Sequence, residues 1–212
     1  METSDKSKTV ATVLGDRIVG RDDFRRIFSE AEQTVAERFL DQTSWKYISE
    51  AHVKDLLRYA DVLSYSEDLR HRELSYVIVS LLLEAGSESL KEEIIPVAEA
   101  VFINLGNFPG ISGLAKAGDS KYVLPASNQA RRLAKEIIQL SSSKRAVLTD
   151  PQYQIRKSLA TVNFFSFSGP TSLGKSFIIK DFLFDLVQQP GLDDQCIICL
   201  LYTSDAADEE DS

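Results

Sequence analysis

Glycine, lysine and serine residues near position 170 have a spacing that suits phosphate binding. Gly169 is followed, after four residues, by Gly174, Lys175 and Ser176, which fits the phosphate-binding pattern G-x4-G-K-[ST]. Glycines allow a turn tight enough for consecutive N–H groups to point at phosphate oxygens, and the dipole of a following helix favours the same anion. Lys175 would reach the β- and γ-phosphates, and the Ser176 hydroxyl would bind Mg²⁺. The pattern therefore predicts a site for ATP and magnesium.

The residues on both sides of this loop follow the order strand, loop, helix that such a site requires. The aromatic-rich run at 163–168 predicts a short β-strand. Apolar residues at helical spacing over 177–187 predict a helix, which Gly191 would end. An ordinary Gly/Ser turn between a strand and a helix is the structural alternative. As a phosphate site, the loop would use Lys175 in catalysis. Its nucleotide-binding residues would be Gly169, Pro170, Thr171, Ser172, Leu173, Gly174, Lys175 and Ser176.

The N-terminal two thirds of the chain predict a bundle of α-helices. Apolar residues recur every three or four positions in five segments, as they do on the buried face of a helix. The third segment, 67–85, is apolar on nearly all sides and is expected at the centre of the bundle. Frequent Gly and Pro residues predict a loop over 106–125. The five predicted helices span about 22–39, 50–63, 67–85, 89–105 and 127–140.

A polar run at 141–145 is the expected boundary between this bundle and a second unit. Asp150 and Pro151 fit the start of a short helix that precedes the predicted strand, and 195–198 predicts another strand. Helix, strand, loop, helix, strand is the opening of a βαβ unit. We expect a mostly α bundle followed by the beginning of an α/β P-loop domain. The predicted divisions are a disordered tail over 1–8, a helical accessory domain over 9–145, a partial P-loop lobe over 146–198 and an acidic tail over 199–212.

The composition is that of a soluble globular protein. Of the 212 residues, 43% are hydrophobic and 26% are charged, and no apolar run approaches the ~18 residues of a membrane helix. The polar N-terminus lacks the features of a secretory signal, so a cytoplasmic location and no membrane contact are expected. Cys196 and Cys199 are too few for a disulfide framework. The net charge is −8, but the acidic tail accounts for much of it, so the charge does not decide whether nucleic acid is a partner.

The loop resembles motif I of the superfamily 2 helicases, the DEAD/DEAH-box class. Residues 170–176 carry this resemblance, and the family usually has A-x-T-G-x-G-K-T. Here Gly169 stands in place of the alanine, Ser172 in place of a glycine and Ser176 in place of the final threonine. Each replacement keeps a small or hydroxyl-bearing side chain, so the resemblance is consistent with the phosphate-binding pattern.

A second resemblance lies upstream of the loop. Residues 148–152 resemble the family's Q motif, whose glutamine reads the adenine edge by paired hydrogen bonds. Gln152 lies 17 positions before Gly169, as expected for this family, and Gln154 is the alternative. The resemblance implies that Gln152 contributes to the nucleotide site and selects adenine.

The resemblance as a whole covers about residues 146–198, a quarter of the chain. It implies a RecA-like lobe that binds ATP and Mg²⁺, and ATP hydrolysis that closes two such lobes on a DNA or RNA strand. No Asp-Glu-x-x motif follows the loop within 177–198, so the chain as written is expected to lack helicase activity. The helical part resembles accessory regions of bacterial superfamily 2 helicases, including phage-defence ones. This implies a protein partner for the bundle.

The C-terminal residues resemble a translated sequencing adapter rather than a protein family. Segment 199–209 is similar to a reading-frame translation of a transposase-type sequencing adapter, so 199–212 is expected to be an artefact and the native chain to continue beyond Ile198. A genuine acidic, disordered tail is the alternative. If the artefact interpretation holds, Cys196 and Cys199 are not a native zinc or redox pair.

Two further classes of function fit the same residues. One is another P-loop NTPase with a helical partner domain, which would usually lack a glutamine before the loop. The other is a helical interaction module with a vestigial loop. His52 and His71 stand alone on charged segments and are expected at the surface or in caps. The basic cluster of Arg131, Arg132 and Lys135 is expected on a solvated helix face rather than on phosphates.

Overall fold

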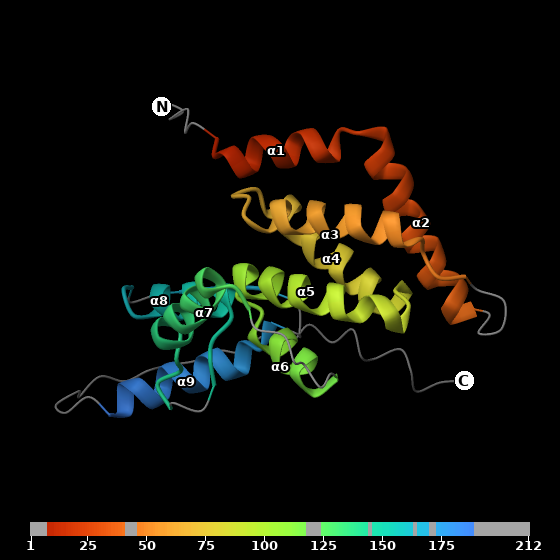
Figure 1. The fold of residues 1–212 in the computed structure, drawn as a ribbon. Helices are drawn as coiled ribbons and strands as arrows, with labels where there is room; N and C mark the ends of the chain where they lie inside the picture. The colour runs from red at the N-terminus through yellow and green to blue at the C-terminus, as the bar shows by residue number, and fades with distance from the viewer. Residues whose placement is uncertain are drawn as a thin grey trace, which may run out of the picture.

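The fold is known from a computed structural model of the chain, which describes residues 8–40, 46–117, 124–143, 146–162, 165–169 and 173–188. Every regular element in these residues is helical (Figure 1). The elements are α1 (Val10–Val19), α2 (Asp22–Leu40), α3 (Glu50–Ser64), α4 (Leu69–Ala85), the 3₁₀ turn η1 (Glu88–Leu90), α5 (Lys91–Leu105), α6 (Phe108–Ala117), α7 (Ala126–Ile138), α8 (Asp150–Leu159) and α9 (Lys175–Val187).

The bundle is built around α4, as its all-round apolar sequence predicted. In Figure 1, α1, α3 and α5 lie one below another, and α4 packs against α2, α3 and α5. Large apolar side chains of the three central helices are fully buried. They include Leu56 and Leu63 of α3, Ile78 and Leu82 of α4, and Ile94 and Ile103 of α5.

The expected loop over 106–125 is wrong for half of its length, because α6 occupies Phe108–Ala117. Phe108, Ile111 and Leu114 recur at a spacing of three and are buried in the core. Pro109 is tolerated because it lies in the first turn, where a backbone N–H has no helical partner. The Asn107 side chain accepts a hydrogen bond from the Gly110 N–H at 3.1 Å, which stabilises that turn.

The predicted α/β unit is also wrong: no β-strand or sheet is present in the described residues. Their one isolated β-bridge joins Leu140 to Val147. Of the strand predicted at 163–168, the described part from Phe165 onward has no regular structure. A strand needs a neighbour to satisfy its backbone N–H and C=O groups, and the described part of the chain provides none here. The second predicted strand, 195–198, lies outside the described residues.

Helix α7 turns its polar face towards the bundle and exposes its apolar face, the opposite of the sequence prediction. Leu133, Ile137 and Ile138 form its apolar face, and they are 58%, 75% and 61% exposed. Arg132 and Lys135 instead point towards α5, where they pair with groups of that helix. The basic cluster therefore does not form the solvated face that was expected. It fixes α7 to the bundle.

None of the described helices is both long enough and apolar enough to cross a membrane.

Candidate phosphate-binding site

The C-terminal end of the predicted loop forms the sharp turn that starts α9. Gly174 adopts the left-handed conformation, with φ 73° and ψ 40°, and Lys175 is the first residue of the helix. A side chain at position 174 would be strained in this conformation, so glycine is required. The Gly174 carbonyl accepts hydrogen bonds from the N–H groups of Phe177 and Ile178, at 2.9 and 3.1 Å. Among the described residues, no side chain caps this end of α9, and the N–H groups of its first turn are directed out of the helix.

Lys175 joins the two ends of the loop. Its ammonium donates a hydrogen bond to the carbonyl oxygen of Gly169 at 2.7 Å, so the first and last parts of the pattern lie together. Ser176 is the second helical residue and is exposed. The predicted residues Pro170, Thr171 and Ser172 lie outside the described residues.

Gln152 lies beside the loop, as the resemblance implied. Its amide Nε2 donates to the Leu173 carbonyl at 3.0 Å, across 21 residues of sequence. The same side chain helps to cap α8: its Oε1 accepts from the Thr149 N–H at 3.0 Å, and Thr149 Oγ1 accepts from the Gln152 N–H. Gln154 is exposed on α8 and makes no hydrogen bond to the described loop residues.

Ion pairs that sequence reasoning missed fix α9 against α8. The Arg156 guanidinium of α8 donates to Asp185, and its Nε lies 3.4 Å from Asp181 Oδ2. It also lies over the Phe182 ring, 5.2 Å from the centroid. The Asp181 side chain is 2% exposed, so this pair is shielded from water. The available signal was the spacing of Asp181 and Asp185, which places both carboxylates on one face of the predicted helix.

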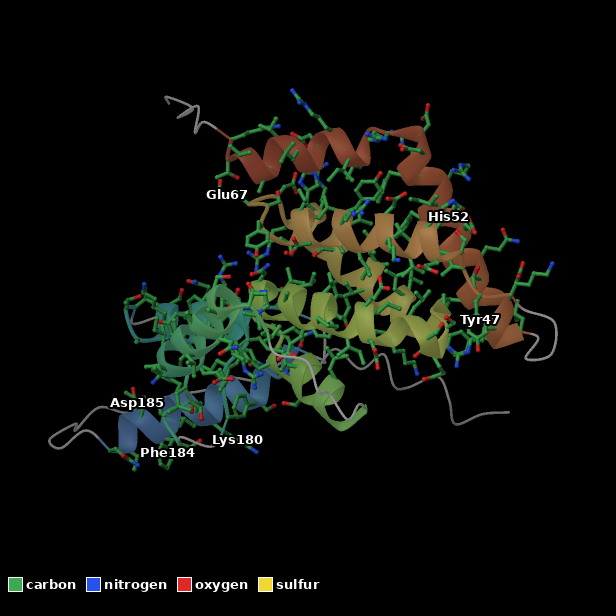
Figure 2. The ribbon with its side chains drawn as sticks, in the orientation of Figure 1. Tyr47, His52, Glu67, Lys180, Phe184 and Asp185 are labelled. Carbon is green, nitrogen blue, oxygen red and sulfur yellow. The ribbon has the colours of Figure 1, made fainter. Side chains whose placement is uncertain are left out.

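The opposite side of α9 is exposed. Lys180 and Phe184 are exposed, and Figure 2 shows both on the side of α9 that faces away from α7. Lys175 is therefore the lysine of α9 that the fold directs towards the loop, whereas Lys180 is a surface residue of the same helix. The two lysines form a matched pair for mutagenesis.

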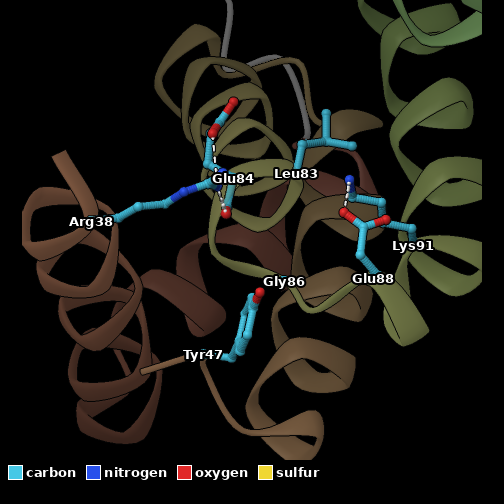
Figure 3. Close-up of a pocket in the computed structure, with 7 residues that line it drawn as sticks. All are labelled: Arg38, Tyr47, Leu83, Glu84, Gly86, Glu88 and Lys91. Atoms are coloured by element: carbon cyan, nitrogen blue, oxygen red, sulfur yellow. Dashed lines mark hydrogen bonds and ion pairs between the residues drawn. The ribbon is translucent and has the colours of Figure 1, made fainter. Parts of the chain in front are cut away.

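A separate pocket lies in the helical bundle, where the ends of α2 and α4 meet η1 (Figure 3). Its volume is about 170 Å³, and it is lined by Arg38, Tyr47, Leu83, Glu84, Gly86, Glu88 and Lys91. Arg38 pairs with Glu84, and Lys91 pairs with Glu88. The two cationic and two anionic side chains balance in charge, so this pocket does not select a phosphate or a metal ion by charge.

Comparisons with protein-family models, with curated proteins and with solved structures found no match.

Proposed function

We propose that the segment Gly169–Ser176, at the N-terminus of α9, binds the phosphates of ATP with Mg²⁺. The observation that carries the proposal is the hydrogen bond from the Lys175 ammonium to the Gly169 carbonyl. It brings the two ends of a phosphate-binding pattern together around the start of a helix. In the presence of nucleotide, the ammonium exchanges this neutral acceptor for charged phosphate oxygens, and hydrogen bonds between charged groups are stronger.

Gln152 supports adenine as the base. Its Nε2 donates to the loop carbonyl of Leu173, so a purine bound beside the loop would lie within reach of this amide. An amide side chain can both donate to and accept from an adenine edge. Recognition would compete with the hydrogen bonds that Gln152 makes to Thr149 and Leu173 in the free protein.

The resemblance extends the proposal to the wider function. It supports ATP binding in a helicase or translocase that acts on DNA or RNA, with the helical bundle as an accessory part that contacts a protein partner. A P-loop NTPase of another kind is the second candidate, and it would show no preference for adenine. A vestigial loop in a helical interaction module is the third, and it would not bind nucleotide.

Calorimetric titration of the full chain with ATP and Mg²⁺ tests these alternatives. Lys175→Ala should weaken ATP binding about 10- to 100-fold, because a charged hydrogen bond contributes about 1.5–3 kcal/mol. Lys180→Ala removes the same charge from the exposed side of α9 and should leave the affinity unchanged. Equal affinities for the two variants, or no binding to the parent chain, would reject the proposal.

The adenine contact needs a substitution that keeps the α8 cap. Gln152→Glu retains an acceptor for the Thr149 N–H, and glutamate is favoured at this capping position, but the Nε2 donor is lost. We expect a larger loss of affinity for ATP than for GTP, because the new carboxylate beside the Leu173 carbonyl weakens phosphate binding of both nucleotides and the lost donor affects adenine alone. An equal loss for both nucleotides would favour another class of P-loop protein.

A further inference from the structure

A polar cluster at the other end of the molecule is not used by the proposed nucleotide site. It lies where α1 crosses the connection between α3 and α4, close to Glu67 (Figure 2). His71 of α4 is at its centre and is only 5% exposed. Its Nδ1 lies 2.9 Å from Ser66 Oγ, and its Nε2 lies 3.6 Å from Asp16 Oδ1 of α1.

The hydroxyl groups of Ser66 and Thr12 form a hydrogen-bonded chain that reaches one ring nitrogen of His71. Ser66 Oγ donates its only hydrogen to Thr12 Oγ1 at 3.2 Å, and it accepts from the Asp68 N–H at 3.1 Å. In the tautomer in which His71 Nδ1 donates to Ser66, the Ser66 hydrogen stays with Thr12. Thr12 Oγ1 in turn accepts from the Glu67 N–H at 3.1 Å, which is consistent with this direction. In the neutral ring, the lone pair is then on Nε2.

This lone pair lies beside two carboxylates. One oxygen each of Asp16 and Asp68 and one ring nitrogen of His71 lie within 4.8 Å of one another. Nε2 makes no hydrogen bond within the described part of the chain, and 3.6 Å is too long for one to Asp16. An unprotonated nitrogen and carboxylate oxygens repel one another unless a cation lies between them. An imidazole nitrogen of a buried histidine next to two carboxylate oxygens is a donor set that suits a metal ion.

We propose that Asp16, Asp68 and His71 bind a zinc ion. His71 would use Nε2, each aspartate would use one carboxylate oxygen, and the fourth position would be open to water. Imidazole favours zinc over magnesium or calcium, which prefer oxygen ligands alone. The Ser66 hydroxyl would hold the other ring nitrogen, as polar neighbours do around metal-bound histidines.

The three ligand atoms lie within 4.8 Å of one another and would move closer around a zinc ion. Ligand atoms about 2.0–2.2 Å from a tetrahedral zinc ion lie about 3.4 Å apart. The pair formed by His71 Nε2 and Asp16 Oδ1 is already at 3.6 Å. Asp16 is exposed, so its side chain is able to move towards the ion. Asp68 accepts the Arg70 N–H at the start of α4 through Oδ1. Its Oδ2 is the oxygen that metal binding would take from Arg70.

Two cations hold these carboxylates in the absence of metal. Lys8 Nζ lies 2.8 Å from Asp16 Oδ2, and Arg70 Nη2 lies 2.8 Å from Asp68 Oδ2. The Lys8 pair is exposed to water and is therefore weak. Zinc would displace Lys8, so removing this lysine should strengthen metal binding. A cluster with a purely structural role would instead be indifferent to zinc and weakened by the same substitution.

The test is a zinc titration of the full chain against a chromophoric chelator. It uses a Cys196→Ser, Cys199→Ser background, so that thiolates cannot contribute. One zinc ion should bind per chain, and Asp16→Asn should weaken binding at least tenfold. Asp23→Asn is the control, because Asp23 also pairs with a cationic side chain but belongs to no His–Asp cluster in the described residues. Lys8→Ala should tighten binding by roughly two- to fivefold.

Two more variants keep the proposal independent of folding defects. Asp68→Asn retains an effective helix cap, so its loss of zinc would report the missing carboxylate rather than a lost helix start. His71→Gln should abolish binding, while His52→Gln should not. Cobalt in place of zinc should give the visible absorption of a four-coordinate ion in the parent and not in Asp16→Asn. Absence of zinc binding by the parent, or equal binding by Asp16→Asn and Asp23→Asn, would overturn the proposal.

Discussion

Gly106 ends α5 in the left-handed conformation, with φ 69°. It lies against Asp150, the first residue of α8. A methyl group at this position would overlap the carboxyl group of Asp150 and would lie 3.0 Å from the Asp150 backbone nitrogen. Gly106→Ala would therefore combine backbone strain with a steric clash. We expect a loss of at least about 2 kcal/mol in the free energy of unfolding, measured in urea.

Gly113 of α6 is the control for this substitution. Nothing lies within 4 Å of a methyl group built there, and its backbone is helical. Gly113→Ala should raise stability by up to about 1 kcal/mol, because alanine favours a helix. If both alanine variants changed stability in the same direction, the special role of Gly106 would be refuted.

Asp61 of α3 makes stability depend on pH. Burial raises the pKa of its carboxyl group, and the Arg131 guanidinium partly opposes this. Because the pKa is higher in the folded state, the folded chain binds more protons than the unfolded chain between the two pKa values. Stability therefore falls as the pH rises through this window, which begins near the unfolded value of about 3.9. Asp61→Asn should raise the melting temperature at pH 7 and lose this advantage at pH 4.

An exposed aspartate separates this effect from a general change in charge. Asp22 has a side chain that is 99% exposed, so Asp22→Asn should show no such gain at pH 7. A benefit of Asp61→Asn that grows towards acidic pH would contradict the assigned direction of the pKa shift.

For the proposed site, sequence reasoning predicted a turn and a helix start from local rules. Gly174 and Lys175 follow from the turn and the helix start, and the structure places Gln152 next to the loop. Sequence reasoning could not identify Arg156 as the residue that joins α8 to α9. Its partners are on a different helix, and charged residues on a helix face are more typical of contact with water.

Helix α7 shows why an amphipathic pattern does not decide which face is buried. Its polar side contacts Glu99 and the Asn104 carbonyl of α5, as well as Asp150 of α8. These acceptors come from other parts of the chain, so periodicity alone pointed the apolar face inward. The same limitation hid α6, where the local Gly and Pro content outweighed three core residues at helical spacing.

Two residues of α7 test this reversed orientation. Lys135 Nζ donates to both carboxylate oxygens of Asp150, at 2.9 and 2.8 Å, whereas Ile137 is 75% exposed. Lys135→Ala should cost about 1–3 kcal/mol in the free energy of unfolding, because it leaves a half-buried carboxylate with fewer partners. Ile137→Lys should change stability by no more than about 0.5 kcal/mol. A larger loss of stability for Ile137→Lys than for Lys135→Ala would instead support the orientation predicted from the sequence.

At the scale of the whole molecule, the error in the predicted fold class has a related cause. A helix satisfies its own backbone, so each of the predicted helices could be argued from a local window. A parallel sheet needs strands from distant parts of the chain, and a strand-like run says nothing about whether a partner is available. The run that ends at Ser168 has strand composition, but the described residues do not pair with it.

The carboxylate of Asp150 connects the helical bundle to α8. Asp150, at the start of α8, accepts from Arg72 of α4 and from Lys135 and Gln139 of α7. Two residues further along α8, Gln152 contacts the predicted phosphate loop. The first turn of α8 therefore connects the bundle to the loop, through Asp150 on one side and Gln152 on the other.

Asp150→Asn should loosen this junction without unfolding either side. The Thr149–Gln152 cap of α8 does not use the Asp150 side chain, so helix content should be unchanged. The charged hydrogen bonds from Arg72 and Lys135 would be weakened, and hydrogen exchange in α8 and α9 should become about tenfold faster, which corresponds to about 1.4 kcal/mol. Exchange in α3 and α4 should remain slow, because their core lies away from the junction. Uniformly faster exchange in all helices would instead mean that Asp150 stabilises a single cooperative unit rather than the connection between two.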